Sequence, residues 1–156
     1  MSRVAIMVDS AAGVDPAFAA EHDLHIVPLL IQMQGQTLRD GVDITPEELY
    51  ALMPTCSPLP TTSQTPIGDL IQAYRSLESE GYDGVVSMHL SSGMSSACAT
   101  ARMAANEVSI PVEIVDTLCA ASGSLFAVEA AVRAAERGAD RSEERRVGKE
   151  GRTVCR

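Results

Sequence analysis

Three apolar runs of strand length, each followed at once by hydroxyl or carboxyl side chains, limit what this chain can fold into. They cover residues 4–8, 85–90 and 110–115. Runs of this kind predict strands that are buried on both faces, as in parallel sheets. Because segments of helical character lie between the runs, the sequence predicts an α/β fold: an open, mostly parallel sheet with helices on both faces.

Local signals locate the helices. Asp15-Pro16 and Thr45-Pro46 each put a capping side chain before a proline at the first helical position. They predict helices over residues 16–22 and 46–53. Apolar spacing, helix-forming residues and terminal glycines predict three more helices, over residues 66–81, 95–106 and 120–137.

The remaining segments suggest strands and loops. Residues 25–33 are expected to form one strand, bulged or at a sheet edge, because Pro28 has no N–H to donate. Residues 34–39 predict the turn and second strand of a small hairpin. Residues 54–66 contain four prolines and a run of hydroxyl side chains, which predicts an extended loop that can face a ligand.

The composition is that of one globular domain. With 156 residues, of which 46% are hydrophobic, the chain can bury a core without disulfides or metal. Its net charge of -9 disfavours nucleic acid, which needs a basic footprint. Four scattered cysteines fit neither a disulfide scaffold nor a zinc site, and no apolar run is long enough to span a membrane. We therefore expect a cytoplasmic protein, not a transmembrane one, without a metal or cofactor.

Charge divides the chain near residue 140. Residues 1–140 carry 6 basic and 18 acidic residues, whereas residues 141–156 carry 6 basic and 3 acidic residues and almost no apolar ones. The composition of this tail predicts disorder. The tail also resembles a translated sequencing-adapter read-through, so we expect one domain over residues 1–140 and a non-native tail over residues 141–156. A basic tail that recruits an acidic partner is the alternative.

Polar side chains follow all three strands. Asp9 and Ser10 follow the first, Ser91 and Ser92 the second, and Asp116 the third. The carboxyl ends of parallel strands meet at one edge, where ligands bind in such sheets. Residues 91–96 also lead into a helix, whose free amides and dipole would favour an anion beside the hydroxyls of Ser91, Ser92 and Ser95. The alternative is that these serines only cap the helix.

A catalytic serine is a second alternative at this turn. Gly93-Met94-Ser95 approaches the nucleophile elbow of hydrolases but lacks the last glycine of that motif. All three histidines precede Ser95, whereas the α/β-hydrolase order needs one after it. Asp9, Asp40, Asp43 and Asp116 could hold Mg²⁺ beside a phosphate, although Asp at a strand end more often caps the next helix or orders a turn. A site rich in hydroxyls and poor in bases suits a carboxylate head on an apolar tail.

Six short motifs stand in order along the chain. They are Val8-Asp9-Ser10-Ala11-Ala12, Val27-Pro28-Leu29, Asp40-Gly41-Val42-Asp43-Ile44, Pro60-Thr61-Thr62-Ser63-Gln64-Thr65-Pro66, Ser91-Ser92-Gly93-Met94-Ser95 and Ile114-Val115-Asp116-Thr117. Each is short, but together and in this order they are specific. Over residues 3–140 the chain resembles the DegV family of fatty-acid-binding proteins.

The resemblance implies two α/β domains with an acyl chain buried between them. It also implies a function: to present the bound fatty acid to a separate ATP-dependent kinase subunit, as the FakB subunit of bacterial fatty acid kinase does, without catalysis by this subunit itself. Hydroxyls of the Thr-Ser-Gln loop and of the serine turn would hold the carboxylate. The residues so assigned are Thr62, Ser63, Ser91, Ser92 and Ser95, with support from Asp9, Ser10 and Asp116.

The chain departs from the family pattern in two ways. The family usually continues with Gly-Thr after the residue that corresponds to Ser95, where this chain has Ser96-Ala97. Family members are also roughly twice as long, so the chain would supply the first domain alone and leave one wall of an apolar tunnel open to water. Weak acyl binding, or a fragment without a function of its own, are therefore alternatives to full fatty-acid carriage.

Overall fold

A four-stranded parallel sheet in the order β2-β1-β6-β7 forms the centre of the computed structural model, which describes residues 3–136. Its strands are β1 (Val4–Asp9), β2 (Leu24–Val27), β6 (Gly84–His89) and β7 (Val112–Asp116). The two central strands, β1 and β6, are buried along almost their whole length, as expected where both faces are covered. The predicted fold class is confirmed. Strand β7 begins two residues later than the apolar pattern suggested.

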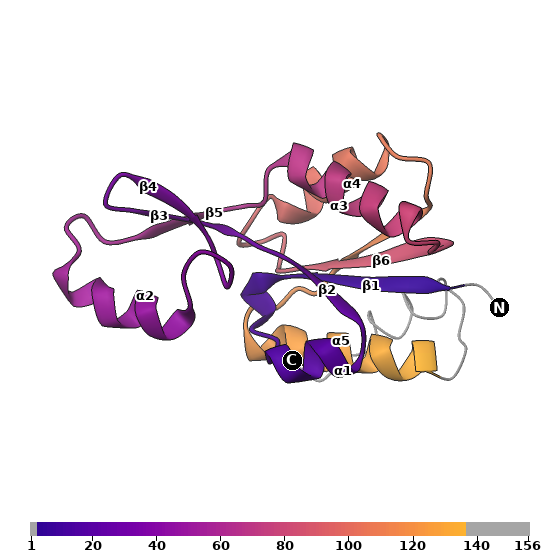
Figure 1. The fold of residues 1–156 in the computed structure, drawn as a ribbon, viewed down its shortest axis with the longest axis horizontal. Helices are drawn as coiled ribbons and strands as arrows, with labels where there is room; N and C mark the ends of the chain where they lie inside the picture. The colour runs from indigo at the N-terminus through magenta and orange to yellow at the C-terminus, as the bar shows by residue number, and fades with distance from the viewer. Residues whose placement is uncertain (1–2, 137–156) are drawn as a thin grey trace.

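Helices cover both faces of this sheet (Figure 1). The helices α3 (Ile67–Ser79) and α4 (Ala97–Ala105) lie on one face, and α1 (Pro16–Glu21) and α5 (Ser122–Glu136) lie on the other. Successive side chains of β1 alternate between the two layers, as a strand requires. Ala5 and Met7 pack with residues of α3 and α4, whereas Ile6 and Val8 pack with residues of α1 and α5.

The predicted helix starts are confirmed by their caps. The Asp15 carboxylate accepts the amides of Ala17 and Phe18 at the start of α1. Thr45 and Glu48 form a reciprocal capping box at the start of α2 (Pro46–Leu52). Two starts are wrong by two residues: the helix expected from Ser95 begins at Ala97, because residues 91–96 form a turn, and the helix expected from residue 120 begins at Ser122. The predicted end of the last helix beyond Glu136 and the predicted tail over residues 141–156 lie outside the described residues.

A second sheet is antiparallel, with the order β4-β3-β5. It contains β3 (Leu30–Met33), β4 (Gln36–Arg39) and β5 (Thr61–Ser63). The predicted hairpin is confirmed as β3 and β4, joined by Gln34 and Gly35 at φ values of 51° and 77°. The segment over residues 54–66, expected to be a loop, instead contains β5 and the end of a short 3-10 helix, η2 (Met53–Thr55).

The prediction of one strand over residues 25–33 is wrong. The segment breaks at Pro28, so that β2 belongs to the parallel sheet and β3 to the antiparallel one. Proline cannot donate to a strand ladder, and the next amide, that of Leu29, donates to the Ser10 hydroxyl at 3.0 Å instead of to a strand. The missing donor at Pro28 and the contact of Leu29 with Ser10 together end the pairing of β2 and redirect the backbone.

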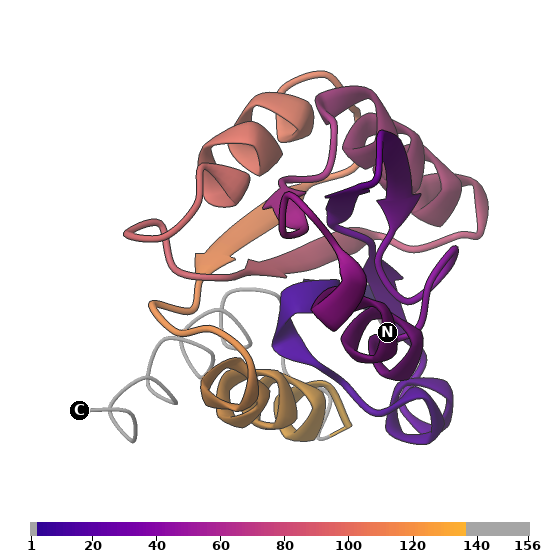
Figure 2. The same cartoon turned by 90° about the vertical axis from the view of Figure 1, so that its left-hand side faces the viewer.

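The antiparallel sheet and α2 lie beyond the carboxyl edge of the parallel sheet. Figure 2, which looks onto that edge, shows them in front of its β2–β1 half, while the loops after β6 and β7 lie to one side. The two elements have a small core of their own, made by Ile31, Met33, Ile44 and Cys56. Within residues 3–136, no helix has the length and apolar character needed to cross a membrane.

Candidate functional site

The neighbouring strands β1 and β6 form the switch point of the parallel sheet. From β1 the sheet continues to β2 on one side, and from β6 it continues to β7 on the other. In such sheets the loops after the two central strands leave in opposite directions and open a crevice at the carboxyl edge. Asp9 and Ser10 end β1 there, and the serine turn, defined as residues 91–96, follows β6. The predicted polar strand ends therefore meet at one edge.

The backbone amides of residues 91–95 already have acceptors within the protein. Ser91 N donates to the carbonyl of Cys119, and the amides of Met94 and Ser95 donate to the carbonyl of Ser91. Side chains receive four others: those of Leu90, Ser92, Gly93 and Ala97. These amides are therefore not free to receive an anion, and the prediction that amides at the start of α4 hold one stays a prediction.

The serine hydroxyls are further donors at this turn. Ser91 Oγ accepts the amide of Gly93 at 3.2 Å, and Ser95 Oγ accepts that of Ala97 at 3.1 Å. An oxygen that accepts in this way still has its own proton to donate. Ser92 is exposed, and its hydroxyl makes no hydrogen bond to another residue within 3–136. These three side chains can therefore present O–H donors to a carboxylate, and two of them are oriented by the backbone.

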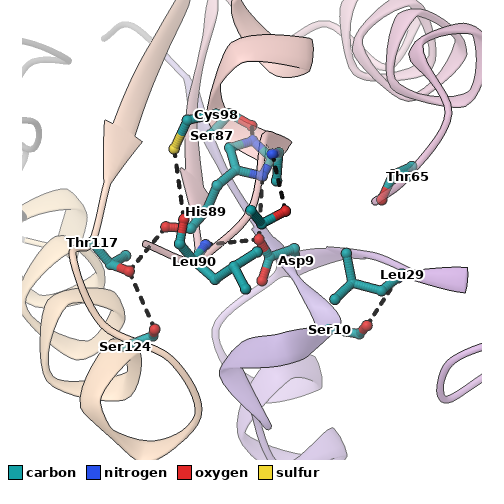
Figure 3. A network of polar contacts seen from close by, with 12 residues as sticks. Asp9, Ser10, Leu29, Thr65, Ser87, His89, Leu90, Cys98, Thr117 and Ser124 are labelled. Atoms are coloured by element: carbon teal, nitrogen blue, oxygen red, sulfur yellow. Dashed lines mark hydrogen bonds and ion pairs between the residues drawn. The ribbon is translucent and has the colours of Figure 1, made fainter. Parts of the chain in front are cut away.

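Two aspartates hold the beginning of this turn. The carboxylate of Asp9, only 2% exposed, accepts the amide of Leu90 through Oδ2 at 2.9 Å (Figure 3). The Asp116 carboxylate accepts the amides of Ser92 at 3.2 Å and Leu118 at 3.0 Å, both through Oδ1. The acceptors lie 81 and 24 residues away in sequence, so the turn is fixed by the neighbouring strands. Both aspartates thus position the backbone of the turn by accepting its amides, and a carboxylate cannot itself donate to an anionic ligand.

The loop between β7 and α5 supports the turn from the other side. Its centre is Thr117, which is 1% exposed and donates from Oγ1 to the carbonyl of His89 at 2.9 Å (Figure 3). The same oxygen accepts the amide of Cys119 at 3.3 Å, and the Cys119 carbonyl in turn accepts Ser91 N at 2.8 Å. Leu118 and Ala121 have φ values of 55° and 49°, which residues other than glycine rarely adopt. The loop is held in an uncommon conformation beside the serines.

Thr62 and Ser63 lie apart from this cluster, on β5. Both are exposed, and within residues 3–136 neither is hydrogen-bonded to the serine turn. The two residues that follow β5 contact other parts of the domain. Gln64 Nε2 donates to Thr100 Oγ1 on α4 at 2.7 Å, and Thr65 Oγ1 donates to the carbonyl of Pro28, directly after β2, at 2.7 Å. The Gln64 contact ties the loop that carries Thr62 and Ser63 to the helix that follows the serine turn.

Ser10 faces a different space. Its hydroxyl accepts the amide of Leu29, and together with Asp9 it lines a cavity of about 590 Å³ between the carboxyl ends of β1 and β2 and the start of α2. Ile26, Pro28 and Val42 form part of its apolar wall. None of the five predicted hydroxyl ligands lines this cavity. Ser10 therefore supports the chain crossing at Leu29 and does not join the serines.

His89 is a buried, hydrogen-bonded core residue. Its Nε2 lies 2.8 Å from Ser87 Oγ, and its Nδ1 lies 3.4 Å from Asp9 Oδ2. Both ring nitrogens thus have partners other than Ser95, and the ring is only 2% exposed. In the described part of the chain, no group of three or more His, Cys, Asp or Glu residues could hold a metal ion.

Sequence reasoning missed three residues that shape this region. Gln64 lies in the hydroxyl-rich run that it singled out, but its partner Thr100 has no signal in the sequence. Thr117 follows Asp116 at a strand end, where its burial could not be foreseen. A polar residue directly after a predicted buried strand is the one signal that pointed toward it.

This arrangement defines a class of protein: an open parallel α/β domain with a hydroxyl-lined site at its switch point. A model of the DegV family, described as uncharacterised proteins, matches residues 3–151, and the chain belongs to this family. Protein DegV of Bacillus subtilis is 34% identical over 132 residues, covering 83% of this chain and 46% of that protein. A DegV domain-containing protein of Listeria innocua is 34% identical over 128 residues, covering 82% of this chain and 46% of the relative.

Solved structures of the family share the fold. A structure of the fatty-acid-binding protein DegV from Bacillus subtilis matches with a TM-score of 0.91 and 26% identity, covering 98% of this chain and 55% of that chain. A Thermotoga maritima protein described as revealing a fatty-acid-binding function matches with a TM-score of 0.88 and 31% identity, covering 96% and 55%. The chain thus spans about half the length of the relatives that it matches.

Proposed function

We propose that this chain binds a long-chain fatty acid, with the carboxylate held at the serine turn. The observation that carries the proposal is the set of hydroxyls at the switch point: Ser91 and Ser95 are oriented by the amides that they accept, and Ser92 is exposed between them. Relatives of the same fold, from Bacillus subtilis and Thermotoga maritima, are described as binding fatty acids. Thr62 and Ser63 would complete the head site from β5.

Hydroxyl donors suit a head group that must stay reactive. They hold a carboxylate through single hydrogen bonds from a neutral donor, without the opposite charge and the paired geometry that an arginine supplies. A carboxylate held in this way keeps an oxygen free to attack a phosphoryl donor. The proposed function therefore includes presentation of the bound fatty acid to a separate ATP-dependent kinase subunit, and the chain itself carries out no catalysis.

Fatty-acid affinity of Ser92→Ala tests the head site. The full 156-residue chain is freed of lipid with organic solvent, refolded and titrated with oleate by calorimetry. Losing one hydrogen bond to a charged group is expected to weaken binding by about tenfold or more. Ser79→Ala is the matched control, because the Ser79 hydroxyl donates to the Ser76 carbonyl on α3, away from the site. If Ser92→Ala binds like the control, or the wild type binds no oleate, the proposal is wrong.

Two further measurements separate carriage from catalysis. Carriage predicts stoichiometric fatty acid in an organic extract of the purified chain and no turnover of ester or phosphate substrates. Acyl phosphate, trapped with hydroxylamine, should form only when ATP and a bacterial fatty acid kinase subunit are both added. Ester turnover that Ser95→Ala abolishes would instead establish a hydrolase at this turn.

A further inference from the structure

A chain of four buried polar groups runs from α3 to the start of the serine turn. Tyr74 on α3 donates from its hydroxyl to Ser87 Oγ at 3.0 Å, and Ser87 Oγ lies 2.8 Å from His89 Nε2. His89 Nδ1 lies 3.4 Å from Asp9 Oδ2, the oxygen that accepts the amide of Leu90. All four side chains are at most 2% exposed. Figure 3 shows Ser87, His89 and Asp9 side by side with Leu90.

The donor and acceptor groups of these four side chains fix the direction of the hydrogen bonds between them. The Asp9 carboxylate can only accept, so the ring nitrogen that faces it, Nδ1, carries a proton. A ring with a single proton then accepts at Nε2 from the Ser87 hydroxyl, and Ser87 Oγ accepts from Tyr74. Burial raises the pKa of Tyr74 to about 12, which keeps its hydroxyl a donor at neutral pH. The hydrogen bonds from Tyr74 to Ser87 and from Ser87 to His89 therefore point toward Asp9, and His89 Nδ1 faces the Asp9 carboxylate at 3.4 Å.

Buried polar groups are costly unless they are paired, so a fully paired chain in the core needs a reason. The neighbouring positions on β6 are apolar and buried: Val85, Val86 and Met88. Apolar residues at 87 and 89 would complete the layer without these costs. What the polar chain adds is a second contact on Asp9 Oδ2, which holds the carboxylate where it receives Leu90 N.

We propose that His89, held by Ser87 and Tyr74, is a positioning residue for the fatty-acid head site. It acts through Asp9: the His89 contact fixes the carboxylate, the carboxylate fixes the amide of Leu90, and this amide sets the direction in which the chain enters the serine turn. This inference rests on the proposed function. His89 itself does not touch the ligand, because it is buried behind Leu90 and its two nitrogens are occupied.

Two substitutions of His89 remove the contacts of its two ring nitrogens separately. His89→Asn places an amide near the position of Nδ1, and so keeps a donor for Asp9 while losing the Ser87 contact. His89→Gln reaches the position of Nε2, and so keeps the Ser87 contact while losing the donor for Asp9. Each variant gives up one buried contact and some ring volume. We therefore expect both to lose similar thermal stability.

The two variants should differ in their affinity for oleate although they have similar thermal stability. His89→Asn is expected to bind within about twofold of the wild type, and His89→Gln about tenfold more weakly. A merely structural role predicts equal losses, in step with the melting temperature. Equal losses, or His89→Gln binding like the wild type, would overturn the inference. Tyr74→Phe removes only the outermost hydroxyl of these buried contacts, and it is the variant to use if the histidine variants do not fold. It should weaken oleate binding by less than His89→Gln does. Unchanged oleate binding in Tyr74→Phe would count against a role of these contacts.

Hydrogen exchange separates this inference from the proposed function. The amide of Leu90 should exchange faster in His89→Gln than in His89→Asn, in the absence of any fatty acid. If the wild type fails to bind oleate but the exchange rates differ in this way, the proposed function falls and the positioning of the turn by His89 stands. If oleate binds and the exchange rates of Leu90 are equal in both variants, His89 does not act through Asp9.

Discussion

Replacement of Thr117 by valine tests whether the β7–α5 loop holds the serine turn. The two side chains have nearly the same shape, so the change removes a hydroxyl without opening a cavity. The hydroxyl oxygen donates to the His89 carbonyl at 2.9 Å and accepts the amide of Cys119 at 3.3 Å. The His89 carbonyl keeps the amide of Thr117 at 3.0 Å, but the Cys119 amide loses this acceptor.

The magnitude follows from these two contacts. The change removes the donation to the His89 carbonyl and the contact that the Cys119 amide makes, and each such hydrogen bond contributes about 1 kcal/mol. Thr117→Val should therefore lower the free energy of unfolding by about 2 kcal/mol. Urea unfolding followed by circular dichroism measures this as a lower midpoint with an unchanged slope.

Thr37→Val is the matched control. Thr37 lies exposed on β4, where its hydroxyl donates to Gln32 Oε1 at 2.8 Å. The same chemical change at this surface position should alter the free energy of unfolding by less than about 0.5 kcal/mol. If the two variants have equal midpoints, the Thr117 hydroxyl does not hold the loop, and the account of how Cys119 is presented to Ser91 is refuted.

Two further predictions concern a cap and a buried phenol. Thr45→Ala removes the capping box with Glu48 and should cost about 1 kcal/mol in urea unfolding, whereas an unchanged midpoint would show that the box does not stabilise α2. Burial raises the pKa of Tyr74 from 10.0 to about 12, so the unfolded chain loses this proton before the folded one does. Its contribution is present below pH 10 and is lost as the pH rises through about 12, by about 3 kcal/mol in all. Unfolding from pH 8 to 11.5 should show a shallower alkaline loss in Tyr74→Phe, and identical profiles would contradict this.

The central sheet could be predicted because each of its core strands is buried on both faces. The continuous apolar run at residues 4–8 and the run at residues 85–90, which contains only Ser87 and His89 as polar residues, have few other ways to fold in a chain of this size. The helix starts at Asp15 and Thr45 could be predicted because a cap is a local contact, formed within three residues. Both kinds of signal depend on neighbours in the sequence.

The break at Pro28 could be detected but not resolved. Proline marks a position that cannot donate, which is compatible with a bulge, an edge strand or a change of sheet. The choice is made by distant residues: the Ser10 hydroxyl accepts the next amide, and Thr65 donates to the carbonyl of Pro28. These partners lie 19 and 37 residues away, beyond the reach of any local pattern.

The same limit applies to the serine turn, and it changes the chemistry of the site. A helix start after a strand predicts free amides, but here Asp9, Asp116 and the Cys119 carbonyl have taken those at the beginning of the turn. Amide donors are fixed in direction, whereas a hydroxyl rotates and can both donate and accept. A site built from Ser91, Ser92 and Ser95 therefore adapts to its head group more readily than an amide cradle would. The rigidity of the proposed site would come from the carboxylates and the core behind it, and the buried contacts from Tyr74 to Asp9 would then belong to the site as much as the serines do.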